Sequence, residues 1–365
     1  MDNIKVTEEI DAHMKDSSKR DFGKAEVLEP RNKVRKKWRR WQKIIFWIIV
    51  IISILVLGGI IAFFSFQSKG KMDLKAEEQY ITYNGKKYKY RQELVNILCL
   101  GIDKSVSMPY VEAERGNIGM SDAVILVSID TKKNIIKAIA IPRDTVTEIQ
   151  KTTKDGELSS KERMRLCIQY AYGISMQQSN ELTVNAVSKM LYNLQIQRCC
   201  AINFEALPII NDAIGGVDVE VKEDIEEWES RLPYGETVHL EGELALRFVK
   251  VRNKYDLNGA ALRTQRQKQY IEVFVQKAKS VVKKNPTIPL TIFQELQKDG
   301  NMCTDITVED IMYLMPKVLR MTFSDDMVQM IPGESVVSQD GHTDYQMDID
   351  AVKKIVIDTF YEEMD

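Results

Sequence analysis

The feature that most constrains this chain is a run of 23 residues without a formal charge, from Ile44 to Phe66. A helix rises about 1.5 Å per residue, so this run is long enough to cross a bilayer core about 30 Å thick. The alternative is a buried helix of a soluble domain, but the run has no polar face. A cleavable signal peptide would have a shorter apolar core and a small-residue site. The sequence therefore predicts an uncleaved membrane anchor.

The residues before the anchor predict its orientation. Residues 1–43 hold 13 Lys and Arg against eight Asp and Glu, and eight of the basic residues lie between Arg31 and Lys43. Trp41 and Trp47 lie at or near the expected membrane interface, where indole rings are enriched. Positive charge is retained on the cytoplasmic side. We therefore expect a disordered cytoplasmic tail over 1–43, a transmembrane helix over 44–66, and a single-pass protein of the cell membrane.

The rest of the chain is acidic and is expected outside the cell. It holds 38 Lys and Arg against 45 Asp and Glu, which is a poor composition for non-specific nucleic-acid binding. Asn84-Gly85 lies between two alternating segments and predicts a β-hairpin. We assign 67–94 to a linker with this hairpin and 95–365 to one extracellular domain, and we expect no nucleic-acid partner.

All five cysteines follow the anchor, and an odd number excludes complete pairing within the chain. Adjacent Cys199 and Cys200 do not have the spacing of a zinc site. We expect most of the thiols to be small buried apolar groups.

Three short apolar runs are predicted to be buried strands because each is aliphatic and bounded by turn residues. They are Ile97–Leu100, Ala123–Ile129 and Ile135–Ile141. Asp103 follows the first run, Asp122 precedes the second, and Arg143-Asp144 follows the third. If the first and third strands are parallel, these charges meet at one edge of the sheet, where ligands bind in open α/β folds. The alternative is that they are solvated loop charges.

Helical patterns alternate with further short strands, which predicts an α/β sandwich with a central mixed β-sheet flanked by helices. The longest pattern runs from Leu262 to Lys283, and another is expected from Lys161 to Tyr172. The apolar stripe of the long helix continues backwards to Gln267 and Arg263, which are four residues apart and share a face. Either the start of this helix lines a cleft, or it leaves the core and Arg263 reaches water.

The usual catalytic motifs are missing from the sequence. It has no G-x-S-x-G, H-E-x-x-H, Walker loop or C-x-x-C, and only three histidines. Acids and arginines remain, a combination suited to phosphate chemistry, in which carboxylates hold Mg²⁺ and guanidinium groups bind phosphoryl oxygens.

Several motifs, in this order, carry a resemblance to a known family. They are NILCLGID, SDAVILVSID, IAIPRDT, INFEALPIINDAIGGVDVEV, LEGELALRFVKVRN and LRTQRQKQ, from about Val95 onward. With the basic tail and single anchor, the chain resembles the LytR-CpsA-Psr proteins of Gram-positive bacteria. The resemblance implies a phosphotransferase with a hydrophobic groove. It would transfer a glycopolymer, such as a teichoic acid or capsular polysaccharide, from an undecaprenyl-pyrophosphate carrier to peptidoglycan and release polyprenyl phosphate, with possible pyrophosphatase side activity.

The resemblance also implies roles for individual residues. Asp103 and Asp122 match the family's acids that bind Mg²⁺, or Mn²⁺ in its place. The residues expected to bind the pyrophosphate are Arg143, Asp144, Lys250, Arg252, Arg263 and Gln267, with Asp144 orienting Arg143. The catalytic set is Asp103, Asp122, Arg143 and Arg263. Two acids and a cluster of arginines can neutralise a pyrophosphate, as cleavage of its anhydride bond requires.

Three positions depart from the family pattern. Met120 stands where an arginine is common, Lys250 replaces the first arginine of an R-x-R pair, and Ala260 stands where an aspartate is common. Lys250 keeps the charge without the bidentate fork. Arg115 would be the group that compensates for Met120, and Asp256 the group that compensates for Ala260. These departures leave a second hypothesis open, in which the protein binds or regulates lipid-linked precursors with weak catalysis.

Overall fold

The computed structural model describes residues 58–59, 61–104, 118–251, 259–321, 328–338, 341 and 343–364, with the backbone alone at 259–261, 264 and 268. The chain divides into two units, Met1–Ala62 and Phe63–Asp365. The predicted tail and most of the predicted span, residues 1–57 and 60, lie outside the described residues. Among the residues that are described, no helix has both the length and the apolar character needed to span a bilayer.

The second unit is built on a mixed six-stranded sheet in the order β11-β8-β3-β4-β5-β12. Its strands are β11 (Met302–Thr304), β8 (Arg198–Asn203), β3 (Leu94–Ile102), β4 (Ser121–Asp130), β5 (Ile135–Ile141) and β12 (Val328–Met330). β4 runs antiparallel to both β3 and β5, so β3 and β5 are parallel to each other. The predicted mixed sheet is confirmed, and all three apolar runs form strands.

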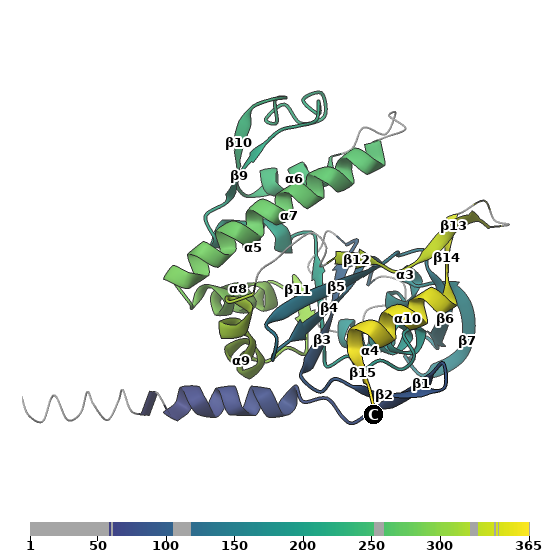
Figure 1. Cartoon of the computed structure of the whole chain (residues 1–365). Coiled ribbons are helices and arrows are strands. Elements are labelled where there is room, and N and C mark those ends of the chain that lie inside the picture. Colours follow the sequence, from purple (N-terminus) through teal and green to yellow (C-terminus); the bar gives the residue numbers. More distant parts are fainter. Residues whose placement is uncertain are drawn as a thin grey trace, which may run out of the picture. The chain divides into compact units, whose positions relative to one another are not determined.

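One face of the sheet packs against α4 (Met176–Met190) and α10 (Ile349–Phe360) (Figure 1). The fully buried Leu98 and Leu126 of the sheet belong to the same core as Val187 of α4. Side-chain caps begin both helices, because Ser175 accepts a hydrogen bond from the Gln178 amide and Asp348 accepts one from the Ala351 amide. Of the apolar cores that pack on the two faces of the sheet, this one is the larger, and it stabilises the central strands.

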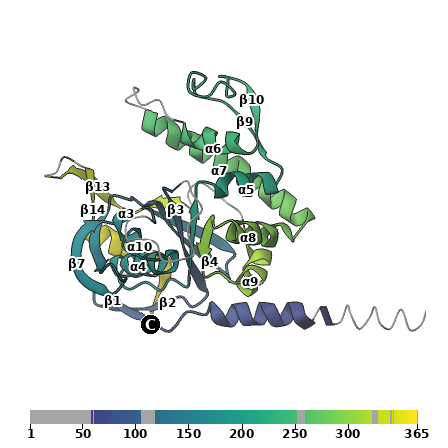
Figure 2. The ribbon, with the colours of Figure 1, turned by 180° about the vertical axis from the view of Figure 1, so that it is seen from behind.

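Part of the other face is covered by α8 (Ile288–Lys298) and α9 (Val308–Val318), which lie across the sheet from α4 and α10 in both views (Figures 1 and 2). A capping box between Thr307 and Asp310 begins α9. Helical residues 63–73 of the same unit also contact α9, where Lys69 Nζ donates to Glu309 Oε1 at 2.9 Å. A Cβ at Gly70 would lie 2.4 Å from the Glu309 carbonyl oxygen, so only glycine permits this approach.

A third layer has its own apolar core. It consists of α5 (Ala206–Ala213), β9 (Val217–Glu220), β10 (Thr237–Leu240), α6 (Glu243–Lys250) and α7 (Gly259–Lys284). Gly215 and Gly216, both with positive φ, follow the end of α5. Phe274 and Ala278 of α7 pack on this core, whereas Ile271, expected in the same stripe, is 49% exposed.

Smaller strands surround these layers. The predicted hairpin is present as β1 (Tyr80–Tyr83) and β2 (Lys86–Tyr90), which pairs with β15 (Tyr361–Glu363). Two further hairpins are β6 (Val146–Thr152) with β7 (Leu158–Arg165), and β13 (Gly333–Val337) with β14 (Thr343–Met347). The helix predicted over Lys161–Tyr172 is wrong in its first half, which is β7; only α3 (Cys167–Tyr170) is helical.

Candidate active site

Four predicted site residues meet at one end of the central sheet. Asp103 follows β3, Asp122 is the second residue of β4, and Arg143 and Asp144 follow β5. Because β4 is antiparallel to its two neighbours, its beginning lies beside the ends of β3 and β5. The arrangement expected from the sequence is therefore present in the structure.

Arg143 joins two of the acids. Its Nη1 donates a hydrogen bond to Asp122 Oδ1, and its Nε donates one to Asp144 Oδ1 at 3.5 Å. The backbone around it is fixed as well, because the Cys167 amide donates to the Arg143 carbonyl at 3.0 Å and the Tyr345 amide donates to the Asp144 carbonyl at 2.9 Å. The three side chains thus form one half-buried network rather than separate solvated charges.

Asp103 is held by the loop that returns to β4. Its Oδ1 accepts a hydrogen bond from the Met120 amide at 2.7 Å, and its own amide donates to the Met120 carbonyl at 3.1 Å. Gly119 makes this turn possible: its φ is +95°, and a Cβ there would lie 2.9 Å from Asp103 Oδ1. Hydrogen bonds of its own backbone therefore fix the position of Met120, which lies two residues before Asp122.

The electrostatics of this cluster favour a cation. Burial raises the pKa of the Asp122 carboxyl; Arg143 opposes that rise, whereas Asp103 and Asp144 add to it by repulsion. Asp103 and Asp122 each use one carboxylate oxygen in a described hydrogen bond, which leaves the second oxygen of each as a hard donor. Among the described residues, no group of three or more His, Cys, Asp and Glu could hold a metal. Two carboxylates fit Mg²⁺ that takes its other ligands from water and phosphate.

Lys250 approaches the same end of the sheet from the third layer. It is the last residue of α6, and its Nζ lies 4.0 Å from the centroid of the Phe204 ring. Phe204 directly follows β8, whose Asn203 is in register with Ile102 of β3. Lys250 is therefore held near the strand ends that carry Asp103. Arg252 lies outside the described residues.

Arg263 and Gln267 occupy the first turns of α7, and both are partly buried. Gln267 Nε2 donates to the Val249 carbonyl at 3.1 Å, so its amide holds the end of α6. Arg263 Nε is buried without a hydrogen-bond partner among the described residues. An unsatisfied buried guanidinium nitrogen is costly, which favours the prediction that this helix start lines a ligand cleft.

Arg266 was missed as a functional residue in the sequence, although several hydrogen bonds hold its side chain in this layer. It is 4% exposed; its Nη1 donates to Glu223, and its other nitrogens donate to the carbonyls of Phe248 and Val251. These bonds attach α7 to the end of α6. The i, i+3 spacing from Arg263 was the available signal, because such residues are neighbours on a helix.

An open apolar strip crosses the sheet face that carries α8 and α9. Ile125 in the middle of β4 is 36% exposed, and its register partners are Cys99 of β3 and Ala140 of β5. Ala140 in turn pairs with Met330 of β12, which is 63% exposed. Ile125 lies on an inner strand, where a large apolar side chain is normally covered, and Met330 extends the exposed apolar surface onto the edge strand β12, which favours a binding surface. The strip begins at Ala123, the residue after Asp122.

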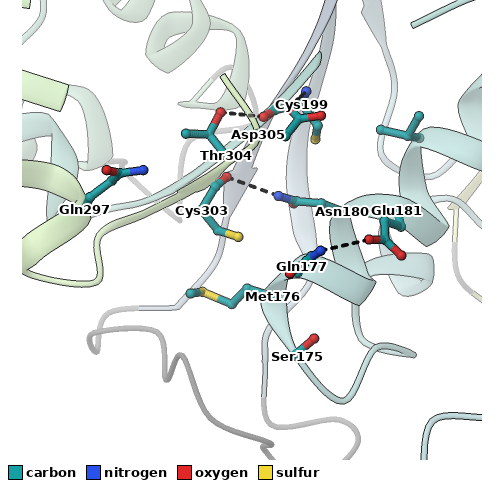
Figure 3. Close-up of a pocket in the computed structure, with 11 residues that line it drawn as sticks. Ser175, Met176, Gln177, Asn180, Glu181, Cys199, Gln297, Cys303, Thr304 and Asp305 are labelled. Atoms are coloured by element: carbon teal, nitrogen blue, oxygen red, sulfur yellow. Dashed lines mark hydrogen bonds between the residues drawn. The ribbon is translucent and has the colours of Figure 1, made fainter. Parts of the chain in front are cut away.

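A separate cavity of about 540 Å³ lies between α4 and β11 (Figure 3). Its polar wall is bonded internally, since Asn180 Nδ2 donates to the Cys303 carbonyl at 3.1 Å and Gln177 Nε2 donates to Glu181 at 3.2 Å. None of the predicted site residues lines it.

Comparison with known proteins identifies the family. The profile of the LytR_cpsA_psr family matches residues 60–359. A Bacillus anthracis relative named polyisoprenyl-teichoic acid–peptidoglycan teichoic acid transferase TagU is 30% identical over 308 residues, or 82% of this chain and 91% of its own. The chain therefore belongs to the LytR_cpsA_psr family, as its motifs predicted.

Two crystal structures share the fold. A Streptococcus agalactiae protein matches 73% of this chain and 87% of its own, with a TM-score of 0.56 and 21% identity. The TagV protein of Bacillus subtilis matches 73% of this chain and 97% of its own, with a TM-score of 0.51 and 21% identity. The α/β fold predicted from the sequence is therefore the fold of this family.

Proposed function

We propose that this protein transfers a teichoic-acid-type or capsular-type glycopolymer from a polyprenyl-pyrophosphate carrier to peptidoglycan and releases polyprenyl phosphate. The Arg143 network with its neighbouring carboxylates carries the proposal, because it concentrates phosphate-binding and cation-binding groups at one end of the sheet. The printed name of the Bacillus anthracis relative supports the substrate class.

In this proposal the pyrophosphate lies between the end of the sheet and the start of α7. Arg143 and Arg263 bind its oxygens, with Lys250 and Arg252 adding positive charge, and Asp144 holds the Arg143 guanidinium in place. Asp103 and Asp122 hold Mg²⁺ or Mn²⁺, which neutralises phosphate charge when bound. The acceptor hydroxyl attacks the phosphorus next to the sugar, the bond from that phosphorus to the bridging oxygen breaks, and the lipid phosphate leaves carrying the proton that the hydroxyl loses.

The open apolar strip supports a polyprenyl carrier. Ile125 and Met330 expose apolar surface within a sheet whose other face is tightly packed. Burying that surface against a hydrocarbon chain is favourable by about 25 cal/mol per Å². The strip begins one residue from Asp122, so a lipid on it would have its phosphate end at the charged cluster.

We also propose that residues 44–66 anchor the protein, with residues 1–43 in the cytoplasm and the domain outside the cell. Charge asymmetry and the length of the uncharged run support this topology. An extracellular domain close to the bilayer would meet both a lipid-linked donor and the cell wall.

The test uses the full chain in detergent with a polyprenyl-pyrophosphate-linked glycan, a peptidoglycan acceptor and Mg²⁺. We expect polyprenyl phosphate to be released, and Arg263→Ala to abolish the release. Tight donor binding without turnover under Mg²⁺ or Mn²⁺, unaffected when Asp103 and Asp122 are replaced, would instead support the binding or regulatory alternative.

A further inference from the structure

A second cavity lies next to the candidate active site and carries two arginines. It measures about 330 Å³ and is lined by Val146, Arg163, Met164, Arg165, Ile168, Ser338 and Asp344. Its walls come from β6, β7, α3 and the β13–β14 hairpin, which are grouped on one side of the sheet (Figure 1).

The backbone segments that form the walls of the cavity are continuous with, or hydrogen-bonded to, the backbone around Arg143. Val146 follows Arg143 by three residues, which is at most about 10 Å of chain. The amides of Leu166 and Cys167, at the end of β7, donate to the carbonyls of Thr145 and Arg143. The same hydrogen bonds that position Arg143 therefore position Arg165, so the cavity adjoins the Arg143 network along the backbone.

The charge of the cavity is positive. Arg163 and Arg165 alternate on β7, so they lie on one face about 6.6 Å apart. Arg165 Nε is 3.9 Å from Asp344 Oδ1, a weak pairing, and Arg163 has no ion pair within the described residues. Glu148, in register with Arg163, is engaged by Lys161 at 2.8 Å. Two guanidinium groups facing one carboxylate leave an unbalanced positive charge.

We infer that this cavity is a subsite for a phosphodiester of the glycopolymer beyond the pyrophosphate. The inference rests on the proposed function, since a polymer whose first phosphate binds Arg143 must leave the site along an adjoining surface. Guanidinium forks match phosphodiester oxygens. Apolar Val146 and Ile168 complete a wall that suits the carbon skeleton of a polyol unit.

The test compares two synthetic donors that share the polyprenyl pyrophosphate and a neutral disaccharide. One ends there, and the other continues with several glycerol phosphate units. We expect the double variant Arg163→Gln/Arg165→Gln to raise the KM of the charged donor about tenfold with kcat unchanged, and to leave the neutral donor unaffected. The effect should shrink at high salt. Arg320→Gln, an exposed arginine of α9's end, is the matched control.

An equal change for both donors, or none for the charged donor, would overturn the subsite. Two further outcomes would also overturn it. One is that a neutral polymer restores the activity of the variant. The other is that the defect instead affects use of a muropeptide acceptor, because the carboxylates of that acceptor would then be the true ligand. If the double variant does not fold, Arg163→Gln alone serves, because that side chain is exposed.

A binding measurement separates this inference from the proposed function. Calorimetry with a lipid-free glycerol phosphate oligomer should give binding to the wild-type protein and weaker binding to the variant. If the variant loses oligomer binding and neither donor is turned over, the transferase activity is rejected and the subsite is kept. If both donors are turned over but the oligomer binds equally to the wild-type protein and the variant, the subsite is rejected and the transferase activity is kept.

Discussion

Arg143 is the side chain on which the geometry of the candidate site depends, because its guanidinium joins Asp122 to Asp144. Arg143→Lys keeps the charge but cannot bond two carboxylates and a phosphate in one plane. We expect kcat to fall on the order of 10²–10³-fold, as for other charge-stabilising donors, with little change in melting temperature. Donor turnover and thermal unfolding measure this. Arg320→Lys is the control, and an unchanged kcat for Arg143→Lys would remove Arg143 from the catalytic set.

Met120 offers a test in the opposite direction. Its position depends on backbone hydrogen bonds to Asp103, which any side chain preserves. Met120→Arg would place a cation beside Asp122 and the bound pyrophosphate, so we expect turnover to rise about tenfold. Steady-state kinetics with the same donor check this. A variant that folds but turns over no faster would mean that the departure from the family pattern is compensated elsewhere.

Sequence reasoning located the charged cluster because three of its members directly follow or begin apolar strands. Sequence reasoning selected Gln267 as a pyrophosphate ligand through the family resemblance, and in the structure its amide donates a hydrogen bond to the Val249 carbonyl. It overlooked Arg266, whose partners are carbonyls and one acid from distant segments. Contacts of that kind depend on tertiary packing, which no local pattern encodes.

At the scale of elements, Arg266 connects α7 to α6. Both it and Glu223 are nearly buried, and removing one partner of such a pair leaves the other charge uncompensated. We expect Arg266→Met to lower the free energy of unfolding by about 3 kcal/mol. Denaturant titration measures this, with Arg247→Met as the control. The Arg247 side chain is 51% exposed, its pair with Glu243 lies at the surface and its 3.9 Å pair with Glu229 is weak, so its loss should cost less than about 1 kcal/mol. Equal losses for the two variants would contradict this role.

Elements with strong apolar periodicity were predictable, and elements without it were not. α7 forms over Gly259–Lys284, within a few residues of the helix predicted over Leu262–Lys283. β7 was predicted as helix because Leu158–Arg165 exposes charged residues on both faces, so it has no alternation to reveal a strand. Its pairing with β6 is what makes it a strand. The β13–β14 hairpin, largely exposed, escaped prediction for the same reason.

At the scale of the whole molecule, all five cysteines are free. Burial raises the pKa of Cys99 and Cys303 to about 11 and that of Cys200 to about 12. Since the thiolate is the reactive form, we expect slow alkylation of the native protein at about pH 8, and faster alkylation only as the pH approaches those values. Mass spectrometry after iodoacetamide treatment, with and without denaturant, measures this. Rapid labelling of the native thiols at about pH 8 would contradict the raised pKa values.

The function that we propose for the whole protein is that it binds a lipid-linked donor at the end of the sheet that carries Arg143 and transfers the donor's glycopolymer phosphate to the wall. The most direct measurement incubates the full chain in vesicles with a radiolabelled polyprenyl-pyrophosphate glycopolymer and peptidoglycan, then counts label attached covalently to the wall polymer. We expect Mg²⁺-dependent attachment of label to the wall polymer, with one polyprenyl phosphate released for each glycopolymer attached, and we expect both to be lost in Arg143→Ala. Attachment that persists in Arg143→Ala, or its complete absence with the wild-type protein while the donor remains bound, would contradict it.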